Sequence, residues 1–151
     1  MKKLLLPLLA LLLFSCSTEE KPSNKIVGSW QYQGITEFTQ DGEAIERAPA
    51  TCTENSTLSF SNNGNLKSVD YTIDSNWDCI INELATSDEL QWEEISDGTY
   101  KIFSARGGTE YEISFPDNST MWMISGGSYT RDGVSYKHKA SVYTKIWNQV
   151  F

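Results

Sequence analysis

Residues 134–145 read VSYKHKASVYTK, and this stretch decides the fold class. Alternate positions that share one face are Val134, Tyr136, His138, Ala140 and Val142. The other face carries Lys137, Lys139, Ser141, Tyr143 and Lys145. A period of two is typical of a β-strand, because successive side chains of a strand point to opposite faces. The stretch therefore predicts a long strand near the end of the chain.

The preceding segments repeat this pattern over shorter lengths. Residues 57–60 and 111–115 alternate, and Asn62-Asn63-Gly64 and Ser96-Asp97-Gly98 supply turns, because Asn, Asp and Gly tolerate a positive φ. The longest irregular stretches are residues 39–49 and 80–88. The face expected for the segment 26–38 holds Gly28, Trp30, Tyr32, Gly34 and Phe38. Short strands joined by tight turns predict an all-β chain, folded as an up-and-down antiparallel β-barrel of about eight strands.

The interior of such a barrel is either filled by side chains or able to hold one small ligand. The side chains that we expect around a ligand pocket are Tyr71, Trp92, Tyr111, Trp122, Tyr136 and His138. Each of them, taken singly, is also explained by core packing, and His138 by a hydrogen bond at a buried or rim position. The sequence leaves both interpretations open.

The N-terminus has the pattern of an export signal. Two lysines precede an apolar stretch from Leu4 to Phe14, which is too short for a spanning helix of about 20 residues. Leu13-Phe14-Ser15-Cys16 closes this stretch and resembles the bacterial lipobox, in which the cysteine thiol takes a diacylglycerol and becomes the new N-terminus. A plain secretory signal with an incidental cysteine is the alternative.

These features predict a signal peptide at 1–15, a tether at 16–25 and a β-barrel domain at 26–151. The polar run 17–24 is typical of a flexible linker. The expected location is the cell envelope, on the outer membrane, with acyl chains such as palmitate on Cys16 as the anchor. Glu19 and Glu20 resemble a surface-export signal but are equally explained as solvated linker, so the periplasmic face and the cell surface both stay open.

The charge balance excludes one class of partner. The chain has 12 basic and 20 acidic residues, and removal of residues 1–15 takes away two lysines and no acid, which leaves a formal charge of −10. Such a surface repels phosphate backbones, so we expect no nucleic-acid partner. The expected partners are the membrane, through the lipid anchor, and a small hydrophobic ligand; the sequence names no protein partner. Five Trp, seven Tyr and six Phe predict a folded domain.

Two cysteines remain once Cys16 carries lipid. Cys52 and Cys79 are 27 residues apart, and in an oxidising compartment an even number predicts one disulfide. A metal or redox pair is the competing interpretation. It has little support, because the sequence contains no C-x-x-C motif and His138 is its only histidine.

The motifs of common enzymes are absent from the sequence. It has no G-x-S-x-G elbow, no H-E-x-x-H, no EF-hand loop and no P-loop. Glu93 and Glu94 are adjacent, so on a strand they point to opposite faces and do not jointly flank a scissile bond. We therefore expect a non-catalytic protein without a cofactor or metal, although fold alone never excludes catalysis.

A family resemblance begins at Ile26-Val27-Gly28-Ser29-Trp30, which resembles the Gly-x-Trp opening strand of lipocalins. The layout that follows is similar to the lipocalin-like lipoprotein domain of certain Gram-negative bacteria. The features that carry this similarity are Cys52, the strand 56–60 with its Asn-Gly turn, Cys79, and the strands 111–113 and 143–145. The resemblance spans residues 26–146 and implies an eight-stranded barrel with a small, mostly apolar ligand.

The same resemblance implies how one end of the barrel is packed. Trp30 is expected at the closed end, under Lys145 of the last strand, with Gly28 allowing a close approach.

Three functions follow as alternatives: a lipid-anchored carrier of a small apolar molecule, a side-chain-filled interaction module, and an outer-membrane barrel suggested by the alternation of Tyr143, Trp147 and Phe151. Outward lysines and the lipobox argue against the third.

Overall fold

The structure is a computed structural model that describes residues 24–147. The predicted signal peptide, Cys16, most of the predicted tether and Phe151 lie outside the described residues. The elements are β1 (Gly28–Thr39), β2 (Ala44–Arg47), the 3-10 helix η1 (Thr53–Asn55), β3 (Thr57–Phe60), β4 (Asn65–Val69), β5 (Tyr71–Ile73), β6 (Cys79–Ile81), β7 (Ser87–Ser96), β8 (Thr99–Ser104), β9 (Gly107–Ser114), β10 (Thr120–Ser125), β11 (Tyr129–Arg131) and β12 (Val134–Ile146).

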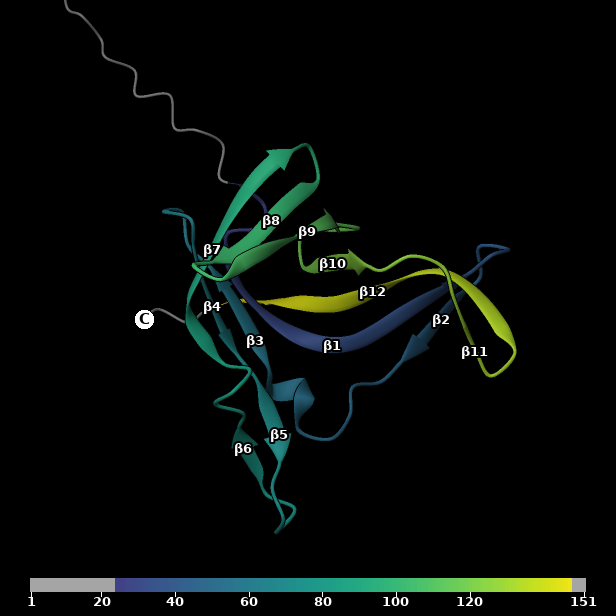
Figure 1. Ribbon diagram of the computed structural model, residues 1–151, viewed down its shortest axis with the longest axis horizontal. Helices are drawn as coiled ribbons and strands as arrows, with labels where there is room; N and C mark the ends of the chain where they lie inside the picture. The colour runs from purple at the N-terminus through teal and green to yellow at the C-terminus, as the bar shows by residue number, and fades with distance from the viewer. Residues whose placement is uncertain (1–23, 148–151) are drawn as a thin grey trace, which may run out of the picture.

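Eight strands form a closed antiparallel barrel in up-and-down order (Figure 1). Each strand pairs with the next in the order β1, β3, β4, β7, β8, β9, β10 and β12, and β12 closes the barrel by pairing with β1. The closing pair is the longest, and it joins Trp30 to Lys145 and Tyr32 to Tyr143. The predicted fold class is confirmed. Closure satisfies the backbone groups that open edge strands would otherwise expose.

Two additions extend the barrel. β2 and β11 pair with the ends of β1 and β12 that reach beyond the barrel, so β2 occupies part of the stretch that the sequence predicts to be irregular. β5 and β6 form a separate two-stranded sheet, which projects at the bottom of Figure 1. Within residues 24–147 there is no helix with the length and apolar character needed to cross a membrane.

Two shifts in the β1–β12 register change which side chains face the interior. One lies between Tyr32 and Gly34, and the other lies between Phe38 and Thr39. The first shift adds a residue to β1, so Phe38 lies on the opposite face from Trp30 and Tyr32. The single face predicted for the segment 26–38 is therefore wrong, because a bulge reverses the alternation of a strand.

The core lies at one end of the barrel and centres on Trp30, which is fully buried. Its indole N–H donates a hydrogen bond to the carbonyl oxygen of Ile26 at 2.7 Å. The ammonium nitrogen of Lys145 lies 5.1 Å from the ring centroid, which is a cation–π contact. A Cβ at Gly28 would lie 2.9 Å from Cε of Lys145, which is too close for a normal contact. Glycine at this position therefore allows the lysine side chain to pack here. This is the packing that the family resemblance implies.

Candidate ligand-binding site

A recess of about 470 Å³ lies against the inner faces of β12, β1 and β3, beyond Trp30 along the barrel. Its apolar walls are Tyr32 and Ile35 of β1, Leu58 of β3 and Tyr143 of β12. The rings of Tyr32 and Tyr143 meet edge to face, with centroids 5.5 Å apart. The barrel therefore offers a concave, partly aromatic surface inside its mouth, where pairing across β1 and β12 fixes both rings.

Polar groups also line the recess. Ser56, Ser68 and Asp70 lie there, and the hydroxyl of Ser68 donates to Oδ2 of Asp70 at 2.9 Å. Burial raises the pKa of Tyr143 far above its ordinary value, and the neighbouring Tyr32 and Asp70 raise it further. Burial also raises the pKa of Tyr32. Both phenols are therefore neutral near pH 7, and they offer the ligand hydrogen-bonding groups without charge.

The segment 48–53 closes one side of the recess, and we name it the flap. Ala48, Pro49, Ala50 and Thr53 of the flap line the cavity. Just before it, the carbonyl oxygen of Arg47 approaches β1 so closely that a Cβ at Gly34 would clash with it. Gly34 also has a φ of +126°, which favours glycine. The path of the chain into the flap therefore depends on a glycine in β1.

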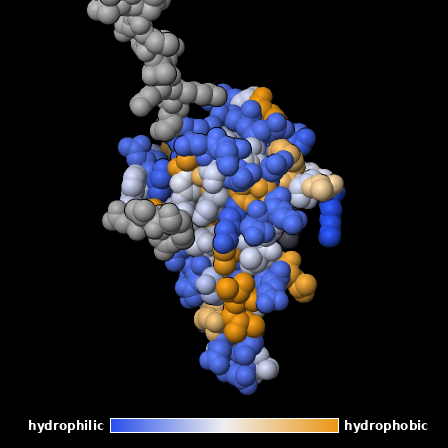
Figure 2. Space-filling view, turned by 90° about the vertical axis from the view of Figure 1, so that its left-hand side faces the viewer, coloured by the Kyte–Doolittle hydropathy of each residue, from blue (hydrophilic) through white to orange (hydrophobic). Residues whose placement is uncertain are grey.

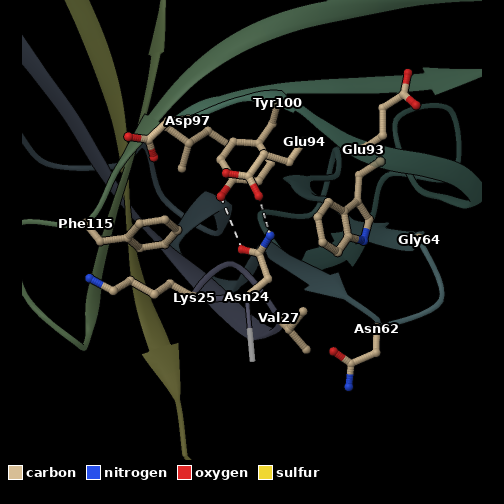
Figure 3. Close-up of a pocket in the computed structure, with 13 residues that line it drawn as sticks. Asn24, Lys25, Val27, Asn62, Gly64, Glu93, Glu94, Asp97, Tyr100 and Phe115 are labelled. Carbon is tan, nitrogen blue, oxygen red and sulfur yellow. Dashed lines mark hydrogen bonds between the residues drawn. The ribbon is translucent and has the colours of Figure 1, made fainter. Parts of the chain in front are cut away.

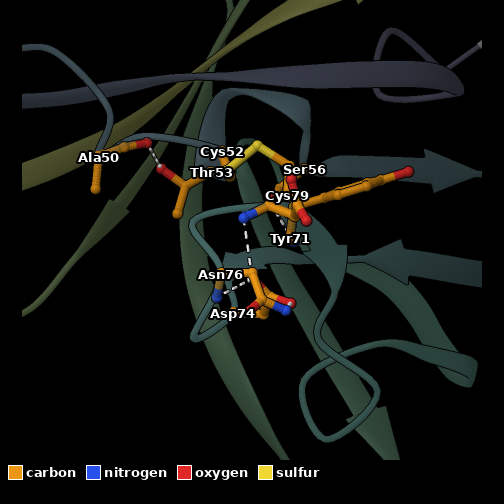
Figure 4. Close-up of a disulfide and its surroundings, with 9 residues drawn as sticks. Ala50, Cys52, Thr53, Ser56, Tyr71, Asp74, Asn76 and Cys79 are labelled. Atoms are coloured by element: carbon orange, nitrogen blue, oxygen red, sulfur yellow. Dashed lines mark hydrogen bonds between the residues drawn. A yellow bond between two sulfur atoms is a disulfide. The ribbon is translucent and has the colours of Figure 1, made fainter.

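A disulfide ties the flap to the projecting hairpin β5–β6 (Figure 4). Cys52 of the flap bonds to Cys79 of β6, and the Cα atoms are 5.4 Å apart. The predicted disulfide is present. The backbone N–H of Tyr71 donates to the hydroxyl of Ser56 at 3.0 Å, which fixes β5 to the chain just after the flap. Because Cys52 is buried and Cys79 is exposed, one half of the bond packs inside and the other faces solvent.

The structure does not bring the six predicted pocket residues together. Tyr71 lies on the separate hairpin. Trp92 lines a second groove, and Tyr111 packs against the core. Trp122 lies between the buried Met121 and Met123 and therefore faces away from the interior. The prediction that these residues line one cavity is wrong, because alternation alone does not tell which face of a strand is the inner one.

His138 and Tyr136 show how this error arose in β12. The ring of His138 packs on Phe38 with centroids 4.7 Å apart, and Phe38 also contacts Trp122 on the outer face. Tyr136 stacks on Tyr129 at 5.0 Å, and its hydroxyl oxygen accepts a hydrogen bond from Arg47 at 3.3 Å. The second register shift separates these two side chains, which a strict period of two places on one face.

The recess residues that sequence reasoning missed are Tyr32, Ile35, Leu58, Ser68, Asp70, Ser141 and Tyr143. One signal pointed to two of them. Ser141 and Tyr143 share a face with Lys145, and the family resemblance placed Lys145 over the buried Trp30. That face of β12 is the inner one. Among residues 24–147 no group of three or more histidine, cysteine and acidic side chains is arranged to hold a metal ion.

Comparison with known proteins adds no assignment to this geometry: no protein-family model matches the chain, and no curated protein matches its sequence.

Proposed function

We propose that the protein is a lipid-anchored lipoprotein of the cell envelope whose barrel binds and carries a small, mostly apolar ligand. The anchor is the lipid on Cys16, and the membrane is the outer membrane, facing the periplasm or the cell surface. The barrel acts by binding rather than by catalysis. The ligand carries an apolar body with a polar group that meets the serines and Asp70 of the recess.

The observation that supports this proposal best is the recess that Tyr32 and Tyr143 line. Its volume of about 470 Å³ falls within the range of small-molecule sites, which are roughly 300–1,000 Å³, concave and lined by apolar groups with a few polar ones. A barrel filled by side chains along its whole length has no such space. The flap and its disulfide hold one wall of the recess in place.

The anchor is tested by replacing its cysteine. In Cys16→Ala the thiol that takes the lipid is absent, so we expect the protein to leave the membrane fraction or to remain unprocessed. Membrane fractionation at high salt, with mass spectrometry of the N-terminal peptide, measures this. Complete retention of Cys16→Ala in the membrane fraction would contradict the anchor.

The carrier function is tested by filling the recess. In Ser141→Leu the larger side chain occupies space beside Tyr143, so binding of the neutral fluorophore N-phenyl-1-naphthylamine should weaken at least tenfold. A fluorescence titration measures the affinity, and a thermal melt verifies the fold. Ser135→Leu is the matched control, because Ser135 lies on the same strand and is exposed.

Two outcomes would contradict the carrier function. One is an absence of saturable binding for this fluorophore and for a broad panel of apolar compounds. The other is equal affinity in Ser141→Leu and Ser135→Leu, which would place the bound fluorophore outside the recess.

A second function, as a protein-interaction module, is favoured by exposed apolar side chains on the projecting hairpin and in the turn that follows it. They are Trp77, Ile80, Ile81 and Leu84, and Trp77 is 83% exposed. Figure 2 shows hydrophobic side chains gathered on the lower part of the molecule, over β5 and β6. Contiguous exposed apolar surface is typical of interaction sites. This function gains support if no ligand saturates the recess.

A further inference from the structure

A second groove lies at the other end of the barrel and shares no residue with the recess (Figure 3). Its volume is about 1060 Å³. Residues 24–27 cross one side of it, and the hairpin of β7 and β8 forms the other side. Val27 lines the groove and Tyr32 lines the recess. The buried Trp30 lies between these two residues in the chain, so the core separates the groove from the recess.

Aromatic side chains form the walls of this groove. Trp92 of β7 and Tyr100 of β8 lie with their ring centroids 6.1 Å apart, and Phe115 lies 5.8 Å from Trp30. The indole N–H of Trp92 donates to the carbonyl oxygen of Ser61 at 3.1 Å, which fixes the ring beside the β3–β4 turn. Aromatic faces carry negative charge density, so they attract an organic cation as well as apolar groups.

Carboxylates of the β7–β8 hairpin make the groove electronegative. Glu94 accepts a hydrogen bond from the side-chain amide of Asn24 at 2.8 Å, and the Asn24 oxygen accepts one from the Tyr100 hydroxyl at 3.2 Å. Figure 3 shows these three side chains meeting at the centre of the groove. Burial raises the pKa of Tyr100 to about 12, and the negative charges of Glu94 and Asp97 contribute to the rise.

Among residues 24–147 no basic side chain forms an ion pair with these carboxylates. Within the described part of the chain, ion pairs involve Glu37 and Asp132 and neither Glu94 nor Asp97. Lys25 lines the groove beside Phe115 but pairs with neither acid, so two carboxylates face one lysine. The side chain of Glu93 points away from the centre of the groove (Figure 3). Carboxylates that have no ion-pair partner within residues 24–147, placed beside aromatic rings, complement a ligand that is both cationic and apolar.

We propose that this groove is a second binding site, which takes a small organic cation with an apolar body, such as a substituted ammonium compound. The ammonium group lies between Glu94 and Asp97, and the apolar body packs on Trp92 and Phe115. A carboxylate ligand is repelled, and a neutral ligand gains only the apolar contact. This site is independent of the proposed carrier function, because it uses a different end of the barrel.

The experiment titrates the purified full-length chain with benzyltrimethylammonium, benzyl alcohol and phenylacetate at one salt concentration. The signal is the NMR shift of the Trp92 indole N–H, assigned by its loss in Trp92→Phe. We expect saturable binding of the cation at least fivefold tighter than that of benzyl alcohol, with no response to phenylacetate. Binding of the cation should weaken as salt is added, because exposed charges are screened.

Three isosteric variants decide whether the binding is local. Glu94→Gln and Asp97→Asn should each weaken binding of the cation at least threefold. Glu93→Gln removes the same charge one residue away, from a side chain that points out of the groove, so it should change the affinity less than twofold. Equal losses in Glu93→Gln and Glu94→Gln, equal binding of cation and alcohol, or no saturable shift with the cation would each overturn the proposal.

Discussion

Removal of the disulfide in Cys52→Ala/Cys79→Ala should lower the free energy of unfolding by about 3.5 kcal/mol, because the bond closes a loop of 27 residues in the unfolded chain. The native contacts around it should survive, since Ser56 still holds β5 through the backbone of Tyr71. The flap loses its link to the hairpin, so affinity in the recess should fall as well. Alanine is chosen because a serine at the buried Cys52 would need a new hydrogen-bond partner.

Urea unfolding followed by tryptophan fluorescence measures the loss. Reduction of the wild-type protein with a phosphine should reproduce it, because Cys79 is exposed and the bond is reachable. If the double variant and the reduced wild type were as stable as the oxidised protein, the disulfide would not constrain the unfolded state as argued.

The second large effect concerns Glu37, a carboxylate on β1 whose side chain is only 3% exposed. Arg47 of β2 and Arg131 of β11 both pair with it, the latter at 3.0 Å, and the hydroxyl of Tyr129 donates to it at 2.8 Å. These contacts join both added strands to β1. Glu37→Gln should lower the free energy of unfolding by roughly 2 kcal/mol, less than for a fully buried pair, because both arginines keep contact with water.

The pH dependence of this effect has a definite sign. Burial alone would raise the pKa of Glu37, but hydrogen bonds from Arg47, Tyr129 and Arg131 outweigh it and lower the pKa below its ordinary value of 4.5. A carboxyl group with a lowered pKa in the folded state contributes stability that is present above its unfolded value. That contribution is lost as the pH falls through the folded pKa.

Urea unfolding of wild type and Glu37→Gln at several pH values tests this. The difference in stability should be constant above about pH 5 and should shrink below pH 4.5. Glu46→Gln is the matched control, because Glu46 is exposed on β2. This substitution removes the same charge but leaves the ion pairs of Glu37 intact. Two results would show that the charge of Glu37 does not hold β2 and β11 to β1. One is a stability difference between wild type and Glu37→Gln that does not change with pH, and the other is an equally large difference for Glu46→Gln.

Particular residues show why the fold was readable from the sequence. The Asn62-Asn63-Gly64 and Ser96-Asp97-Gly98 turns are local, and they fall between β3 and β4 and between β7 and β8. The alternation of Tyr111 and Ile113 places Ile113 in the core. Turn chemistry and period-two alternation act over a few residues, so they are visible without any partner strand.

The candidate site was not readable in the same way. Tyr32 and Tyr143 are 111 positions apart, and only the closing pair of β1 and β12 brings them together. The buried charge of Glu37 looks like an ordinary exposed acid in the sequence, since Arg131 is 94 residues away. Nor does any local signal mark the bulges, which reversed the assignment of Phe38 and separated Tyr136 from His138.

The sequence by itself determined the strand order, the turns and the pair of cysteines that form the disulfide. The strands and turns depend on residue type and short spacing, because a side chain's alternation and a turn's φ are local properties. The disulfide follows from the number of cysteines, since only Cys52 and Cys79 remain to pair once Cys16 carries lipid. Only the tertiary structure decided which face of each strand is the inner one. That choice depends on the register between strands, and a shift of one residue moves every following side chain to the other face.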